Sequence, residues 1–71
     1  MATLSATFVQ ALARSNPDRL ARTFHASLVG SYRTLTIERV RDAIDHWLAG
    51  QKAEGIIEMF VFGWLDDGVD D

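Results

Sequence analysis

Apolar residues recur every three or four positions in three segments of the chain, a spacing that predicts three α-helices. The first segment ends before Pro17, which disfavours helical geometry in the residue that precedes it. The second begins at Asn16-Pro17-Asp18, where the asparagine can cap a helix and the proline suits its first position. The third begins after the capping residue Thr36 and ends near Gly50. The apolar positions are Phe8, Val9 and Leu12 in the first segment, Leu20, Phe24 and Leu28 in the second, and Ile37, Val40, Ile44, Trp47 and Leu48 in the third.

The segment from residue 56 to residue 65 is apolar or glycine at every position except Glu58. Its β-branched and aromatic residues favour a strand, and Gly55 and Gly63 weaken a helix. Its spacing favours a helix, because apolar residues recur at i, i+1, i+4, i+5, i+8 and i+9. A strand would also need a partner, and only the stretch around residues 31–35 offers one. We therefore expect a fourth helix and keep the strand as the alternative.

The predicted fold class is all-α, a compact bundle of three to four short helices. The alternative is an α+β fold, with three helices and a two-stranded ribbon from about 31–35 and 56–65. A chain of 71 residues holds one domain, which we place at residues 1–65, followed by an acidic tail at residues 66–71. A domain this small has a marginal core, and without cysteine no disulfide can support it, so a partner chain would add to its stability.

The net charge of −3 conceals two halves of opposite sign. Residues 1–41 carry six arginines against two acidic residues, a balance of +4. Residues 42–71 carry one lysine against eight acidic residues, a balance of −7. Such an asymmetry concerns the choice and orientation of partners rather than the fold.

The sequence offers no constellation typical of catalysis or metal binding. His25 and His46 are its only histidines, and Asp42 lies four residues before His46, but two ligands on one helical turn do not make a metal site. It contains neither a nucleophile turn of the GxSxG type nor a glycine-rich phosphate loop. We predict a non-enzymatic protein with no catalytic residues, no metal and no cofactor.

The apolar segment at residues 56–65 carries the leading functional prediction. A helix that is apolar on nearly every side must be covered nearly all round, and three short helices cover only part of it. We expect the remainder, with Met59 and Phe62 foremost, to lie exposed and to bind another protein chain. The alternative is that Phe8, Phe24, Trp47 and Trp64 cover the segment within one chain. The predicted protein-binding residues are Met59, Phe60, Phe62 and Trp64.

The arginines carry the alternative prediction, a helix-turn-helix-like DNA-binding regulator that uses the Arg-rich N-terminal half. The helix that begins at Thr36, followed by Gly-Ile-Ile-Glu at residues 55–58, resembles the end of a winged-helix unit, in which a recognition helix leads into a strand. Asp42 and Asp45 oppose this interpretation, because they would repel phosphate. The candidate contacts to nucleic acid or to an acidic partner are Arg19, Arg22, Arg33, Arg39 and Arg41.

The leading prediction is therefore a small regulator, adaptor or inhibitor that binds another protein, either itself in a homo-oligomer or a heterologous protein. Nucleic acid is the less favoured partner. The first eight residues lack the features of a signal peptide, and no apolar run approaches the about 20 residues that a bilayer requires. We accordingly expect no membrane association and a cytoplasmic location.

Overall fold

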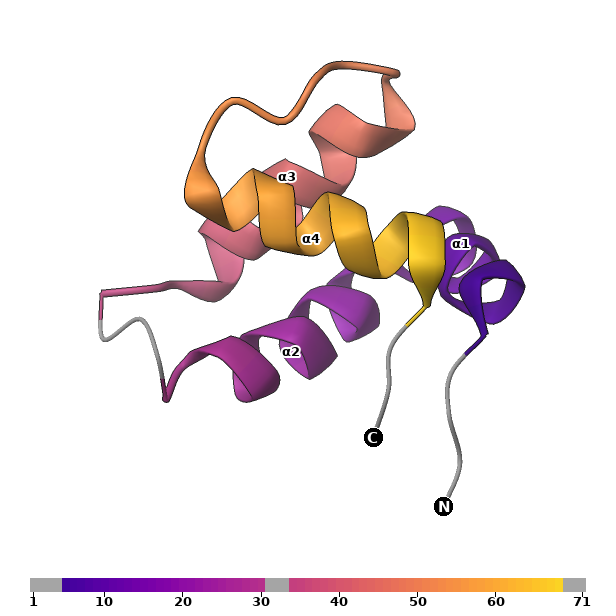
Figure 1. The fold of residues 1–71 in the computed structure, drawn as a ribbon. Helices are drawn as coiled ribbons and strands as arrows, with labels where there is room; N and C mark the ends of the chain where they lie inside the picture. The colour runs from indigo at the N-terminus through magenta and orange to yellow at the C-terminus, as the bar shows by residue number, and fades with distance from the viewer. Residues whose placement is uncertain (1–4, 31–33, 69–71) are drawn as a thin grey trace.

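The computed structural model describes residues 5–30 and 34–68 and arranges them in four helices (Figure 1). These are α1 (Ala6–Ser15), α2 (Pro17–Leu28), α3 (Ile37–Leu48) and α4 (Ile56–Asp67), and the described residues contain no strand. The predicted all-α bundle is confirmed. The α+β alternative and the winged-helix resemblance are wrong at residues 56–65, because this segment is helical; residues 31–33 of the predicted ribbon lie outside the described part.

Three of the four helices begin after a residue whose side chain caps them. The side chains of Ser5, Asn16 and Thr36 each accept a hydrogen bond from the amide three residues later, at 3.2 to 3.3 Å. Each bond satisfies one of the amides that a helix leaves without a partner at its start. At α4 the capping position is Gly55, which forms no side-chain hydrogen bond. The amino end of α4 is therefore the one that depends least on a local cap.

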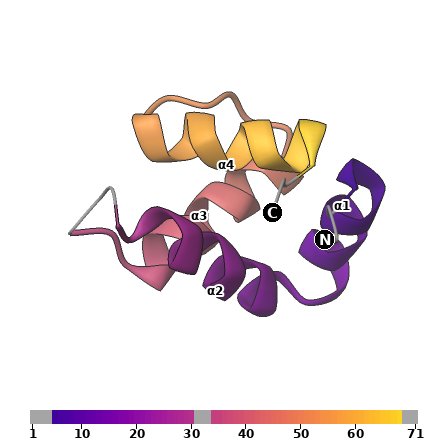
Figure 2. The same ribbon diagram turned by 60° about the horizontal axis from the view of Figure 1, so that its bottom comes forward.

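α3 and α4 run in the same direction, as Figures 1 and 2 show. The chain must therefore return along the whole of α3, a helix of 12 residues and about 18 Å, before α4 begins. Residues 49–55 make this return and can span only about 23 Å when extended. Gly50 starts the reversal at φ 74°, a left-handed conformation that glycine adopts without steric cost. The amino ends of α3 and α4 consequently lie at one end of the molecule and their carboxyl ends at the other.

α2 runs antiparallel to α3, α1 lies beside the carboxyl end of α4, and α4 forms an outer layer across α3 (Figures 1 and 2). The core lies where the four helices meet, and its largest fully buried side chain is Phe24 of α2. The ring of Phe24 lies 4.5 Å from that of Trp64 in α4, centroid to centroid. The buried core consists of Val9, Ala13, Leu20, Ala21, Phe24, Leu28, Leu35, Val40, Ala43, Ile44, Ile57, Val61 and Leu65.

Replacing Phe24 by alanine should lower the free energy of unfolding by about 3–5 kcal/mol, because it removes the largest core side chain and leaves a cavity. This is a large part of the stability of a domain of this size. Thermal unfolding followed by circular dichroism measures the change. Phe8→Ala is the matched control: Phe8 is 50% exposed, so its loss should cost less than about 1 kcal/mol. Equal losses in the two variants would contradict the placement of the core.

Candidate functional site

The inner side of α4 holds the helix against the rest of the bundle. Ile57, Val61 and Leu65 are buried and follow one another at intervals of four residues. Trp64, seven residues after Ile57, lies on the same side because two helical turns separate them. It is half-buried and contacts the ring of Phe24. This one side supplies all the apolar surface that α4 contributes to the core.

The outer face of α4, formed by Ile56, Met59, Phe60 and Gly63, lies on the opposite side of the helix. Ile56 is 62% exposed, Met59 64% and Phe60 46%. These three residues are spaced at i, i+3 and i+4, so they form one continuous apolar surface. They line a shallow hollow of about 250 Å³. A Cβ atom added at Gly63 would meet nothing within 4 Å, so this position faces open space.

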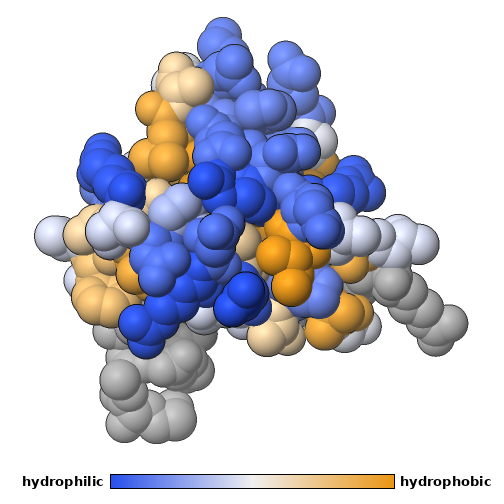
Figure 3. Space-filling model, turned by 180° about the vertical axis from the view of Figure 1, so that it is seen from behind, coloured by the Kyte–Doolittle hydropathy of each residue, from blue (hydrophilic) through white to orange (hydrophobic). Residues whose placement is uncertain are grey.

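The reverse side of the molecule has a different character. Figure 3 shows it from behind, on the side away from α4 in Figure 1, and it is mostly hydrophilic. Hydrophobic residues appear there as separate groups, one at the upper left and others right of the centre. Isolated apolar residues are normal on a protein surface, whereas a continuous apolar helix face is a candidate for binding.

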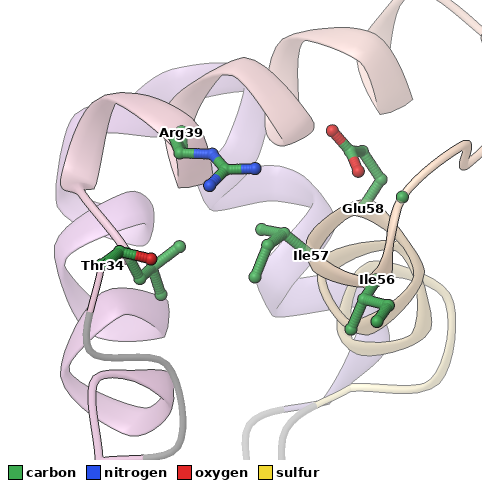
Figure 4. A pocket seen from close by; sticks show the side chains of 7 residues that line it. Thr34, Arg39, Ile56, Ile57 and Glu58 are labelled. Atoms are coloured by element: carbon green, nitrogen blue, oxygen red, sulfur yellow. The ribbon is translucent and has the colours of Figure 1, made fainter.

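A second hollow of about 290 Å³ lies between the amino ends of α3 and α4. Figure 4 shows Arg39 reaching from α3 and Glu58 from α4 toward the gap between the two helices. Ile56 borders both this hollow and the hollow on the outer face of α4. The apolar surface of α4 is thus continuous, at its amino end, with a region that carries an exposed arginine.

The structure separates the four residues that the sequence indicated for protein binding. Met59 and Phe60 lie on the outer face of α4. Phe62 is half-buried, less exposed than expected, and Trp64 packs into the core. Sequence analysis missed Ile56, although its spacing of three and four residues from Met59 and Phe60 places it on their face.

The alternative expectation, that four aromatic residues cover α4 within the chain, holds only in part. Phe24 is buried against Trp64, and Trp47 is half-buried at the edge of the core. Phe8 is 50% exposed. It lies two residues from Gln10, the α1 residue that contacts α4, so the two side chains point about 160° apart around α1. Phe8 therefore lies on a different side of α1 from Gln10, and half of its surface is in solvent.

Polar contacts fix the carboxyl end of α4. The indole N–H of Trp47 donates a hydrogen bond to Asp66 Oδ1 at 3.0 Å, and Gln10 Nε2 donates to the Leu65 carbonyl at 2.9 Å. The guanidinium of Arg14 lies 5.7 Å from the centre of the Trp47 ring, within reach of a cation–π interaction. Residues of α1 and α3 thus hold the last turn of α4. The helix also continues through Asp67, two residues into the predicted acidic tail, whose residues 69–71 lie outside the described part.

Arg41 is held within the bundle by two carboxylates. It donates hydrogen bonds to Asp18 of α2, at 3.0 Å, and to Asp45 of its own helix. The hydrogen bond to Asp45 is the main cause of a raised pKa at Arg41, with a smaller contribution from Asp18. The guanidinium therefore stays charged, but its charge serves the packing of α2 on α3.

The candidate arginines do not form one surface on α3. Arg39 and Arg41 are two residues apart, which places them on opposite flanks of the helix. Arg39 is exposed beside α4, whereas Arg41 faces α2. Arg19 and Arg22 are exposed on α2, and Arg33 lies outside the described residues. DNA binding stays a prediction, and Arg41, which already pairs with Asp18 and Asp45, is the arginine least available to a phosphate.

The chain matches none of the protein-family models, curated proteins and solved structures with which it was compared. Within residues 5–30 and 34–68, no three His, Cys, Asp or Glu side chains are grouped so that they could hold a metal ion. No helix in the same described ranges has the length and apolar character needed to cross a membrane. What the protein does must therefore be inferred from its own surface, and the outer face of α4 is the feature that stands out.

Replacing Trp47 by phenylalanine should lower the free energy of unfolding by about 1 kcal/mol, because it removes the hydrogen bond to Asp66 but keeps an aromatic ring. Urea denaturation measures this loss. In an Asp66→Ala background the same substitution should cost much less, since the bond is already absent. Equal costs in the two backgrounds would show that Trp47 acts through packing alone.

Proposed function

We propose that the protein is a small, non-enzymatic protein-binding module that docks another protein chain on the outer face of α4 and associates with itself. The observation that carries the proposal is the continuous exposure of Ile56, Met59 and Phe60 on one side of a helix whose other side is in the core. Apolar side chains that stay in contact with water add no hydrophobic stabilisation to the folded chain. Such a surface is typical of an interaction site.

The size of the surface indicates a weak, reversible contact. Burying each of the three half-exposed side chains contributes about 1–2 kcal/mol, so two copies contribute six such side chains. This gain is of the same order as the free energy lost when two molecules lose their independent motion. We therefore expect self-association at micromolar concentration rather than a permanent dimer.

The small size of the domain supports the same proposal. With 71 residues and no cysteine, the chain relies on one modest core. Contact with a partner adds apolar burial that the single chain cannot provide. Such a domain is large enough for a regulator, adaptor or inhibitor, because a protein that works by docking needs an exposed surface and no large catalytic pocket.

Met59→Lys should abolish self-association without unfolding the protein, because residue 59 is 64% exposed and lysine is a good helix former. Sedimentation equilibrium should show the mass of the wild-type protein rising with concentration, while the variant remains a monomer. Phe8→Lys places the same charge at a half-exposed apolar residue of α1 and should behave like the wild type. A wild-type protein that stays monomeric through the micromolar range would contradict self-association.

Association should survive about 1 M sodium chloride, because apolar contact supplies the affinity and screening affects only charges. A salting-out salt such as sodium sulfate should strengthen it. Arg39→Glu or Arg41→Glu should change the free energy of association by less than about 1 kcal/mol, the usual limit for exposed ion pairs. Dissociation in sodium chloride, or a tenfold loss of affinity in Arg39→Glu, would show that charge is the main attraction.

A further inference from the structure

We propose that the outer face of α4 binds an amphipathic helix of another protein, one whose apolar residues are accompanied, two helical turns away, by lysine or arginine. This inference rests on the proposed function and specifies the chemistry of the partner. Two features of α4 carry it: its exposed apolar residues, and two exposed aspartates that lie on the same side of the helix.

The apolar residues and the aspartates share one side of α4. Asp66 follows Met59 by seven residues, and Asp67 follows Phe60 by seven. Seven residues make almost two helical turns, so each aspartate lies about 10 Å farther along the same side. Both aspartates are exposed. The side of α4 that bears the outer face is therefore apolar toward its amino end and acidic at its carboxyl end.

The described part of the chain does not neutralise the charge at the carboxyl end of α4. Its ion pairs are the two that Arg41 forms, so neither Asp66 nor Asp67 is paired with a cation. The last turn of α4 contains no basic residue, and carboxylates there lie at the negative end of the helix dipole. Trp47 donates a hydrogen bond to Asp66 but carries no charge, and Arg14 lies over the ring of Trp47 instead. A lysine or arginine from a partner would stabilise this end.

The amino end of α4 has no such imbalance. Arg39 and the positive ends of α3 and α4 lie there together with two carboxylates, Glu38 in the first turn of α3 and Glu58 in the first turn of α4. The Glu58 carboxylate lies against Gly55, the residue that precedes α4. Because opposite charges offset one another at this end, the charge that a partner must match lies at the carboxyl end.

The α4 of a second copy matches only the apolar part of this surface. Residues 56–67 contain three acidic residues and neither lysine nor arginine. Two copies can cover each other's apolar residues, as the proposed self-association requires, but their α4 helices provide no cation for Asp66 or Asp67. The same carboxylates repel anionic membranes and nucleic acids. A basic segment of another protein matches both the apolar and the acidic part.

A helix is the form in which such a segment can lie on α4. Residues 5–30 and 34–68 contain no strand to which an extended peptide could add by edge pairing. A helix satisfies its own backbone hydrogen bonds and packs its side chains between those of α4. Its apolar residues, three or four positions apart, would contact the outer face, and basic residues seven positions away would lie at the two aspartates.

Three synthetic amphipathic peptides test the charge requirement. They share one pattern of leucines and differ only at the positions two helical turns away, which hold lysine, glutamine or glutamate. Fluorescence anisotropy of the labelled peptides with dilute protein measures each affinity. The lysine peptide should bind about tenfold more tightly than the glutamate peptide, with the glutamine peptide between them. Equal affinities, or tighter binding of the glutamate peptide, would overturn the proposal.

Substitutions in the protein locate the contact. Asp67→Asn removes one charge and keeps the shape of the side chain, so it should weaken the lysine peptide about threefold and leave the glutamine peptide unchanged. Asp42→Asn is the matched control, because Asp42 is an exposed carboxylate in the middle of α3, and it should have no effect. Met59→Glu should weaken the lysine peptide even though it adds a negative charge, because it removes an apolar contact. Equal effects of the two asparagine variants, or tighter binding by Met59→Glu, would show that general charge attraction holds the peptide and would overturn the proposal.

Failure of this inference can be told apart from failure of the proposed function. In sedimentation equilibrium the lysine peptide should replace the self-associated species by a complex of one protein and one peptide, because both use the outer face. If self-association persists beside bound peptide, or depends on Met59 while no peptide binds, the basic partner is wrong and self-association stands. If the wild-type protein is monomeric but binds the lysine peptide through Met59, self-association is wrong and the basic partner stands. If neither is observed, both are wrong.

Discussion

An apolar helix can be covered by a small bundle on only one of its sides, and the rest of this structure depends on how α4 meets that constraint. Its inner side, with Ile57, Val61 and Leu65, completes a core centred on Phe24. α1 and α3 hold its carboxyl end through Gln10 and Trp47, so the helix cannot roll to bury its other side. The outer face is exposed because residues 5–30 and 34–68 form no further helix that could cover it.

Most of the fold could be predicted because local signals and the apolar pattern agree in the first three helices. Side-chain caps at Ser5, Asn16 and Thr36 set where these helices begin. In α4 the two kinds of signal conflict, since β-branched and aromatic residues favour a strand while the spacing favours a helix. The spacing prevailed because a strand needs a partner, whereas a helix satisfies its backbone internally and presents one side to the core. Residue type alone would have given the wrong fold.

The candidate site could be predicted less well, because it depends on which side of α4 faces inward. The sequence indicated Met59, Phe60 and Trp64 as exposed binding residues. Met59 and Phe60 do lie on the outer face, but Trp64 packs inward against Phe24. Exposure of Ile56 follows from the same rotation. The same difficulty applies to the arginines. Arg39 and Arg41 are close in the sequence, but the helix places them on opposite flanks. When a helix is apolar on every side, its sequence does not indicate which side will face the core.

The parallel course of α3 and α4 has an electrostatic consequence within the bundle. Antiparallel neighbours offset one another's dipoles, whereas parallel neighbours concentrate positive potential at one end and negative potential at the other. Here the carboxylate of Glu58 lies close to Gly55 at the first end, where it opposes the positive potential of the two amino termini. The extended return of residues 49–55, which the bundle needs for topological reasons, therefore creates the positive end that Glu58 offsets.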